Sequence, residues 1–325
     1  MGSSYILRRV ASAIFTIVLI VILNFVLFRA MPGSPERVLL GRMPGVTAEV
    51  LAGVRERWGL DKPLFPDQFV AYISSTARGD LGFSYSARGR PVTEVLGQHL
   101  GPTLLLFGLG ELLAIVGGLT LGAYSGWKRG GPVDYIGNGI SLVLYSMPYF
   151  LLGMALILVF ATGLGWFPTF GMITAGATYD GLLDQMFDLG SHLALPLLTV
   201  ALGLVGQYAI LMRSSVIETL GDDYITTGRA MGFKDSRVLR RHALPNAMLP
   251  TVTLVAINLG YVVAGAITVE VVFNWPGLGT LTVNALAARD YPVLQGVFLL
   301  LSIAVVFANL GADLLYGVLD PRVRT

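Results

Sequence analysis

The side chains that could carry out chemistry are few and scattered in this chain. A phosphate-binding P-loop needs a lysine between glycine and Ser or Thr, but the three lysines follow Asp, Trp and Phe. These lysines are Lys62, Lys128 and Lys234. The three histidines, His99, His192 and His242, are far apart in the sequence, and we expect none of them to share a helical face with another histidine or with a carboxylate at metal-ligand spacing. The sequence therefore predicts neither nucleotide binding by a P-loop nor a metal site.

Nucleophilic catalysis is equally hard to place. The chain has no cysteine, which excludes thiol nucleophiles, thiolate metal sites and disulfides. An intramembrane serine protease would need a serine on a glycine-flanked turn inside a span together with a partnered histidine, and no serine meets this requirement. We therefore expect a chain without catalytic residues or a cofactor of its own.

Composition indicates a membrane protein. Of the 325 residues, 54% are hydrophobic and 13% charged, and the mean hydropathy is +0.70. Six stretches reach the roughly 20 apolar residues that a helix needs to cross a bilayer. They are 10–28, 103–124, 134–160, 193–212, 249–273 and 292–316. The first is longer than the apolar part of a signal peptide, so we predict an all-α protein with six transmembrane helices.

Basic residues in the short loops set the expected orientation, because cytoplasmic loops retain Lys and Arg. They lie near both chain ends and in the loops after the second and fourth spans. Residues 161–192 contain neither Lys nor Arg. Both termini are therefore predicted to be cytoplasmic. We expect three regions: residues 1–29 with the first span, an extracytoplasmic loop subdomain over 30–102, and a transmembrane core over 103–325. In the loop subdomain we expect helices at 47–58 and 66–73, then a turn at 79–84.

Several polar side chains fall inside predicted spans, where a charge costs about 2.5–3.5 kcal/mol on insertion scales. Glu111 can line a transport pathway or form a structural hydrogen bond, and both alternatives stay open. For Asn258 and Asp313, bonds between helices are the default expectation. Glu270, at the outer end of the fifth span, is expected to anchor the following turn.

Small residues and prolines predict where spans pack and bend. Gly110, Ala114, Gly118, Gly122 and Gly126 recur every four residues, which predicts a ridge for close approach of another helix. Inside the third and fourth spans, Pro148 and Pro196 each remove a backbone hydrogen bond and permit a kink.

A basic segment at 213–250 fits the apolar chain least well. Asp222 or Asp223 can cap a short helix that Gly232 ends in a left-handed conformation, and Asp235 or Ser236 can cap a second helix through Ala243. The first helix is expected to expose an apolar tip suited to a cleft on a soluble partner, formed by Ile225, Ala230, Met231 and Phe233. The alternative is a solvated, positively charged loop.

This segment resembles the EAA loop of permease subunits in binding-protein-dependent ABC importers. Gly232 matches the glycine of that pattern, and Leu244-Pro245 match its closing pair. Thr226-Thr-Gly228 stands in place of E-A-A, and His242 replaces an isoleucine.

Further blocks resemble the first permease of dipeptide and oligopeptide importers, including the nickel importers, over nearly the whole chain. They are residues 79–84, 102–103, 240–246, 269–279, 288–292 and 320–322. One departure is Pro32-Gly-Ser-Pro35, where that family usually has Asp in the third place.

The resemblance implies the type I ABC importer permease fold and one half of a heterodimer with a homologous second permease. It further implies two cytosolic ATPases that bind ATP and magnesium, an extracytoplasmic substrate-binding protein, and a cell-membrane location. The coupling loop, 213–249, would dock on an ATPase around Gly232. Relatives carry dipeptides, longer peptides, glutathione or chelated nickel, so the cargo stays open. An ion-gradient-driven secondary transporter using Glu111 or Asp313, and an intramembrane enzyme, are the alternatives.

Overall fold

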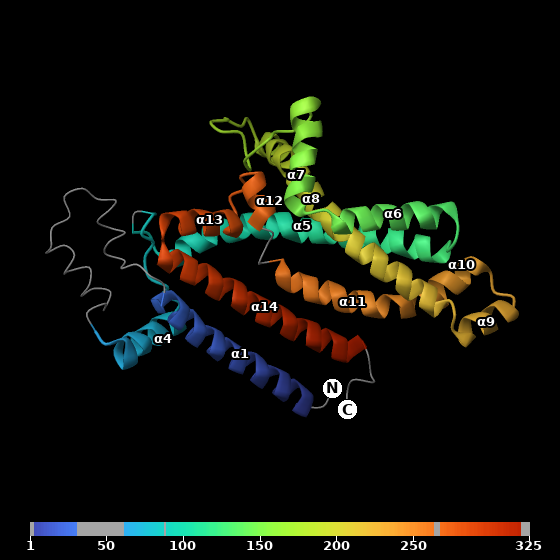
Figure 1. The fold of residues 1–325 in the computed structure, drawn as a ribbon, viewed down its shortest axis with the longest axis horizontal. Coiled ribbons are helices and arrows are strands. Elements are labelled where there is room, and N and C mark those ends of the chain that lie inside the picture. The colour runs from blue at the N-terminus through green and yellow to red at the C-terminus, as the bar shows by residue number, and fades with distance from the viewer. Residues whose placement is uncertain (1–2, 31–61, 88, 263–266, 320–325) are drawn as a thin grey trace.

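In the computed structural model, residues 3–30, 62–87, 89–262 and 267–319 are described. They form an elongated bundle of helices, with α4 and α13 at one end of the long axis and α9 and α10 at the other (Figure 1). The main helices are α1 (Ser3–Ala30), α4 (Phe69–Ala77), α5 (Val92–Trp127), α6 (Pro132–Ser146), α7 (Tyr149–Leu156), α8 (Leu182–Thr219), α9 (Asp223–Ala230), α10 (Asp235–Val238), α11 (Leu244–Tyr261), α12 (Ile267–Val272), α13 (Leu278–Ala288) and α14 (Tyr291–Leu319). Within the described ranges the only β-type pairing is an isolated bridge between Phe83 and Pro91.

The helix pair α5 and α8 forms the centre of the bundle, and the predicted glycine ridge is its contact surface. A Cβ atom at Gly118 or Gly122 would overlap Tyr208, Ala209 or Met212 of α8. At Gly126 it would come within 2.9 Å of the Arg213 carbonyl oxygen and the Val216 Cβ. These glycines therefore allow two backbones to approach more closely than any larger residue would permit.

Four helices of the described chain are long and apolar enough to cross a membrane: α1, α5, α8 and α14. A fifth span arises if the bent pair 132–146 and 149–163 is counted as one. The predicted fifth span at 249–273 corresponds to α11 and α12, with residues 263–266 outside the described ranges. Most helices also extend past the predicted limits, because amphipathic turns continue each helix beyond its apolar core.

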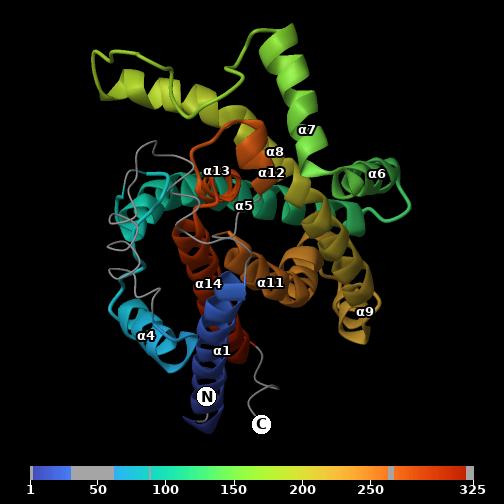
Figure 2. The same ribbon diagram turned by 60° about the vertical axis from the view of Figure 1, so that its left-hand side comes forward.

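The two proline predictions have different outcomes. At Pro148 the third span breaks, and α7 leaves α6 at an angle of 106°, so α7 projects from the bundle (Figure 2). Pro196 lies within α8, whose helix continues on both sides of it. A proline following an extended residue, as Met147 is at ψ 125°, ends a helix, whereas a buried helix with neighbours on its flanks tolerates one.

The end of the molecule opposite α9 contains the described part of the predicted loop subdomain. Its second predicted helix is confirmed as α4, which follows a bent segment at Leu64–Gln68 in which Phe65 is extended. The predicted turn is confirmed too, since Gly79 and Gly82 have φ angles of +78° and +81°. The helix predicted at 47–58 lies outside the described residues. In addition, α5 begins at Val92, well before the predicted start at residue 103.

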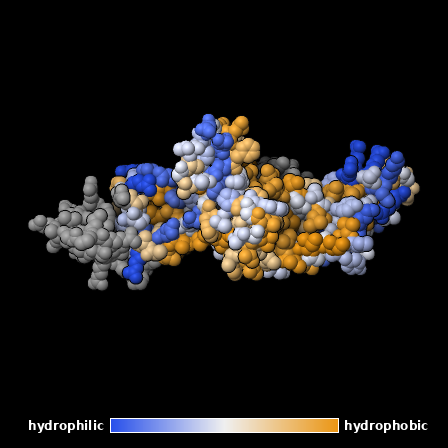
Figure 3. Space-filling model, turned by 90° about the horizontal axis from the view of Figure 1, so that it is seen from above, coloured by the Kyte–Doolittle hydropathy of each residue, from blue (hydrophilic) through white to orange (hydrophobic). Residues whose placement is uncertain are grey.

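The hydropathy of the surface changes along the long axis of the molecule. In the space-filling view, hydrophobic side chains cover much of the middle of the molecule, and strongly hydrophilic ones gather at the end that carries α9 and α10 (Figure 3). Exposed leucine, isoleucine, valine and phenylalanine side chains are frequent on α1, α5 and α6. Such an apolar belt is expected of a protein whose outer surface faces lipid.

Candidate functional site

The basic segment forms the bent helix pair that the sequence predicts. α9 ends at Ala230 with Met231 as its C-cap, and Gly232 follows with a φ angle of +79°, a left-handed conformation that favours glycine. The amide of Gly232 donates to the carbonyl of Arg229 at 2.9 Å, and α10 then begins after Lys234. The chain thus reverses direction at one glycine.

The predicted apolar tip is only partly correct. Ala230 and Met231 are exposed, with Met231 63% accessible, as expected of a surface that meets a partner. The prediction for Ile225 is wrong: its side chain is fully buried, and it packs in a cluster with Val238 and Ala243. Because α9 folds back on α10, the face that carries Ile225 turns inward and becomes the core of the helix pair.

Phe233 is half-buried and is held between two basic side chains. Its ring stacks on that of His242 with a centroid distance of 5.8 Å and an interplanar angle of 2°. The Arg237 guanidinium lies 4.7 Å from the centre of the Phe233 ring. Phe233 therefore fixes the turn internally and contributes little to the exposed tip.

The predicted caps and the predicted end of the second helix need correction. Asp222 occupies the N-cap position of α9, and Lys234 that of α10, but neither side chain caps its helix by a hydrogen bond. The helix also does not end at Ala243: it continues from α10 through a π-helical turn at Leu239–Ala243 into α11. Pro245 is the second residue of α11 and directly follows this π-helical turn.

The helix pair is continuous with the membrane bundle. The amide nitrogen of Asn246 in α11 donates to the hydroxyl of Tyr224 in α9 at 2.9 Å. Ala247 packs with Met212 and Val216 of α8. α9 is therefore joined to α11 by a side-chain hydrogen bond, and α11 packs on α8.

Glu111 forms an interhelical hydrogen-bond chain. Its carboxylate accepts from the buried hydroxyl of Tyr208 in α8, which in turn accepts from the Asn258 amide of α11 at 2.9 Å. Glu111 itself is 2% exposed. Three helices are thus linked through one tyrosine. In this conformation Glu111 and Asn258 form structural hydrogen bonds between helices.

Asp313 is also engaged between helices. Its carboxylate lies 2.9 Å from the guanidinium of Arg9 on α1, and both side chains are partly exposed. The pair connects the beginning of α1 to the later part of α14. Asp313 is therefore separate from the chain that joins Glu111 and Asn258 through Tyr208, and the three residues form no common site.

Sequence reasoning gave no role to Asp290, which is fully buried between α13 and α14. Its Oδ2 accepts from the Ser84 hydroxyl at 2.6 Å and from both the amide and the hydroxyl of Ser86 at 2.8 and 2.6 Å. Two of the sequence blocks, 79–84 and 288–292, thus meet at one carboxylate. The signal that could have indicated this was an acidic residue in a short polar block between two apolar helices.

Two other blocks meet at Glu270, whose predicted anchoring role is confirmed. Its carboxylate accepts from Thr103 at 2.7 Å and from the amide of Gly279, in the first turn of α13, at 2.7 Å. The indole of Trp275 donates to the Pro102 carbonyl at 2.9 Å. The start of α13 is therefore fixed to α5.

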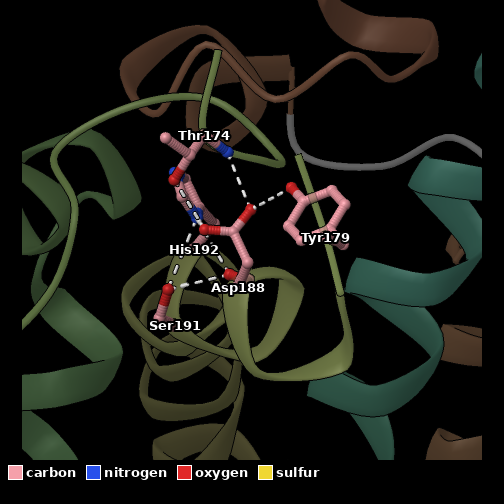
Figure 4. A network of polar contacts seen from close by, with 5 residues as sticks. All are labelled: Thr174, Tyr179, Asp188, Ser191 and His192. Atoms are coloured by element: carbon pink, nitrogen blue, oxygen red, sulfur yellow. Dashed lines mark hydrogen bonds and ion pairs between the residues drawn. The ribbon is translucent and has the colours of Figure 1, made fainter. Parts of the chain in front are cut away.

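A polar network fastens the loop before α8 to that helix (Figure 4). Asp188 accepts from the amide and hydroxyl of Thr174 at 2.8 and 2.6 Å and from the Tyr179 hydroxyl at 2.7 Å. The hydrogen bond to Asp188 raises the pKa of Tyr179. These bonds hold the loop against α8. The expectation that no histidine shares a helical face with a carboxylate is wrong here, since His192 Nδ1 lies 3.5 Å from the Asp188 carboxylate one turn earlier on α8.

Comparison with known proteins matches this architecture to a transport family. Residues 118–325 match the binding-protein-dependent transport system inner membrane component, and residues 3–98 match the N-terminal membrane component of such systems. A putative peptide permease protein of Brucella suis biovar 1 is 38% identical, covering 98% of both chains. The glutathione transport system permease protein GsiC of Salmonella choleraesuis is 37% identical, covering 99% of both chains.

A solved structure is also similar. The MetNI methionine ABC transporter, crystallised in inward facing conformations, superposes with a TM-score of 0.56 at 19% identity, covering 70% of this chain and 96% of that one. At this identity the likeness concerns the fold alone. Together with the apolar helices, the comparisons show that the chain is a multi-pass membrane protein of the binding-protein-dependent transport system inner membrane component family, and thus a permease of an ABC importer and not an enzyme.

Proposed function

We propose that this chain forms one half of a translocation pathway for peptides, with a homologous second permease as the other half. Relatives named as peptide and glutathione permeases over their full length support a peptide-like cargo. We place both termini and α9 on the cytoplasmic side of the cell membrane, in accordance with the distribution of basic residues.

In this proposal α9 is the element that receives work from a cytosolic ATPase, which binds ATP and magnesium. The observation that carries it is the combination of an exposed apolar tip at Ala230 and Met231 with a buried support around Ile225. An exposed methionine on a short helix is suited to a cleft on a partner. The continuous helix from α10 into α11 then carries the movement to the membrane bundle.

The loaded substrate-binding protein would dock at the opposite end, on the surface formed around α13 and the loop before α5. Asp290 and Glu270 hold these segments in place. A secondary transporter would instead need Glu111 or Asp313 to exchange an ion, but each already has a partner in this conformation.

The test replaces Gly232 by valine in the assembled transporter. The open space around Gly232 means that strain in the backbone, and not a clash, is what the substitution introduces. We expect ATP hydrolysis to continue while uptake of labelled peptide falls at least tenfold. The matched control is Gly176→Val: Gly176, in the loop before α8, has φ +74° and equally open space. Normal uptake by the Gly232 variant, or an equal loss in the control, would contradict the coupling role.

A further inference from the structure

A groove lies at the turn between α5 and α6, with a cavity volume of about 510 Å³. Tyr124 and Trp127 line it from the last turn of α5, Lys128 and Arg129 from the turn itself, and Val133 from the start of α6. The groove adjoins α9, because the Arg229 guanidinium lies 5.8 Å from the centre of the Trp127 ring.

The groove carries uncompensated positive charge. Lys128 and Arg129 are exposed and have no ion-pair partner among the described residues. The nearby carboxylate of Asp134 is already occupied: Arg213 donates to it at 2.5 and 3.0 Å, and the Gly130 amide at 2.9 Å. Lys128 and Arg129 are therefore exposed beside a carboxylate whose hydrogen bonds go to other groups, and their side chains are accessible to an anionic ligand.

An apolar surface continues from the groove along both helices. On α5, the face away from α8 exposes Leu112, Val116 and Tyr124 at spacings that are multiples of four residues, and the next position in this row is Lys128. On α6, Val133, Ile136, Ile140 and Val143 are exposed in the same way. A molecule with an anionic head and an apolar tail would match this order of side chains.

Aromatic residues mark the boundary between the two parts. Tyr124 is 53% exposed and Trp127 half-buried, and such amphipathic rings prefer the level of lipid headgroups. The acidic surface of a partner protein would use the cations but not the apolar rows on α5 and α6. We propose that this groove binds an anionic phospholipid, with its phosphate at Lys128 and Arg129, its interface region at Tyr124 and Trp127, and an acyl chain along α5 and α6. This inference depends on neither the peptide cargo nor the coupling role of α9.

The experiment measures quenching of Trp127 fluorescence by brominated lipids in nanodiscs that contain the full chain with its copurifying subunits. The chain has four tryptophans, so the Trp127 signal is the difference between the wild type and Trp127→Phe. At equal low mole fractions, brominated phosphatidylglycerol should quench Trp127 more strongly than brominated phosphatidylcholine. In K128Q/R129Q the apparent affinity for phosphatidylglycerol should fall roughly 30-fold, since two basic residues near a membrane surface contribute about 2 kcal/mol. The control K62Q/R78Q, which removes two exposed charges at the other end, should retain the preference.

Several results would overturn the proposal. These are equal quenching by the two lipids, an unchanged preference in K128Q/R129Q, or displacement of the lipid by millimolar inorganic phosphate, which would indicate a site for a free anion. Loss of a copurifying subunit from K128Q/R129Q, without any lipid preference in the wild type, would identify a protein-docking surface instead. If the double variant does not assemble, the single variants K128Q and R129Q are measured, and the wild-type comparison of the two lipids decides independently.

Discussion

The two ends of the bundle are held together by different forces. At the α13 end, buried carboxylates organise the structure: Asp290 and Glu270 are both fully buried, and each accepts several hydrogen bonds. The α9 end is stabilised by a small apolar cluster, by the stacked rings of Phe233 and His242, and by an ion pair at 3.7 Å between exposed side chains. Buried charge-assisted hydrogen bonds cost more to break than exposed contacts.

This contrast suggests that the two ends have different functions. A rigid end can present a fixed surface to a binding protein, while a lightly held end can move with a partner at low cost. The predictions below test this contrast, beginning with the largest expected effect.

Replacing Asp290 by alanine should be the most damaging change. It leaves Ser84 and Ser86 without their buried acceptor, and we expect the free energy of unfolding to fall by about 2–4 kcal/mol. A thermal-shift assay of the purified transporter measures it. The control is Asp67→Ala, since Asp67 is exposed at the same end. Similar losses of stability in the two variants would contradict the claim that buried carboxylates make this end rigid.

Ile225→Ala should destabilise the α9 end by about 2 kcal/mol, because it removes buried methyl groups from a cluster of only three buried residues. The loss should be local, with faster amide exchange and proteolysis in α9 and α10 while the α13 end is unaffected. Exchange that rises equally at both ends would show that the two regions unfold as one unit.

Met231→Ala should change stability by no more than about 0.5 kcal/mol, since the side chain is 63% exposed. In the proposed role it should still lower the number of peptides imported per ATP hydrolysed. An unchanged ratio in this variant, together with an intact Ile225→Ala variant, would argue against any specialised function of the tip.

Arg229→Gln should have the smallest effect, within about 0.5 kcal/mol. Its partner Asp235 is 75% exposed at the side chain, and solvent screens such a pair. A high-salt titration of the wild type provides the comparison, because salt should reproduce the effect of the substitution. A large loss of stability would show that the α9 end relies on charge after all.

Features of the fold that depend on residues close together in the sequence could be predicted from it. The glycine spacing on α5 predicted a helix contact, and Gly232 predicted the reversal after α9, because both depend on backbone geometry. The burial of Ile225 could not be read in the same way, since it depends on how α9 folds against α10. Asp290 was missed because its three donors lie about 200 residues earlier in the chain.

The central claim, that α9 meets the ATPase, can be tested directly because the chain contains no cysteine. A single cysteine at Met231 should form a cross-link to the ATPase subunit with a short bifunctional thiol-to-amine reagent. A cysteine at Leu286 of α13, which is 59% exposed, should form none. Cross-linking of the ATPase to Leu286→Cys, or its absence from Met231→Cys in a transporter that still hydrolyses ATP, would contradict the account.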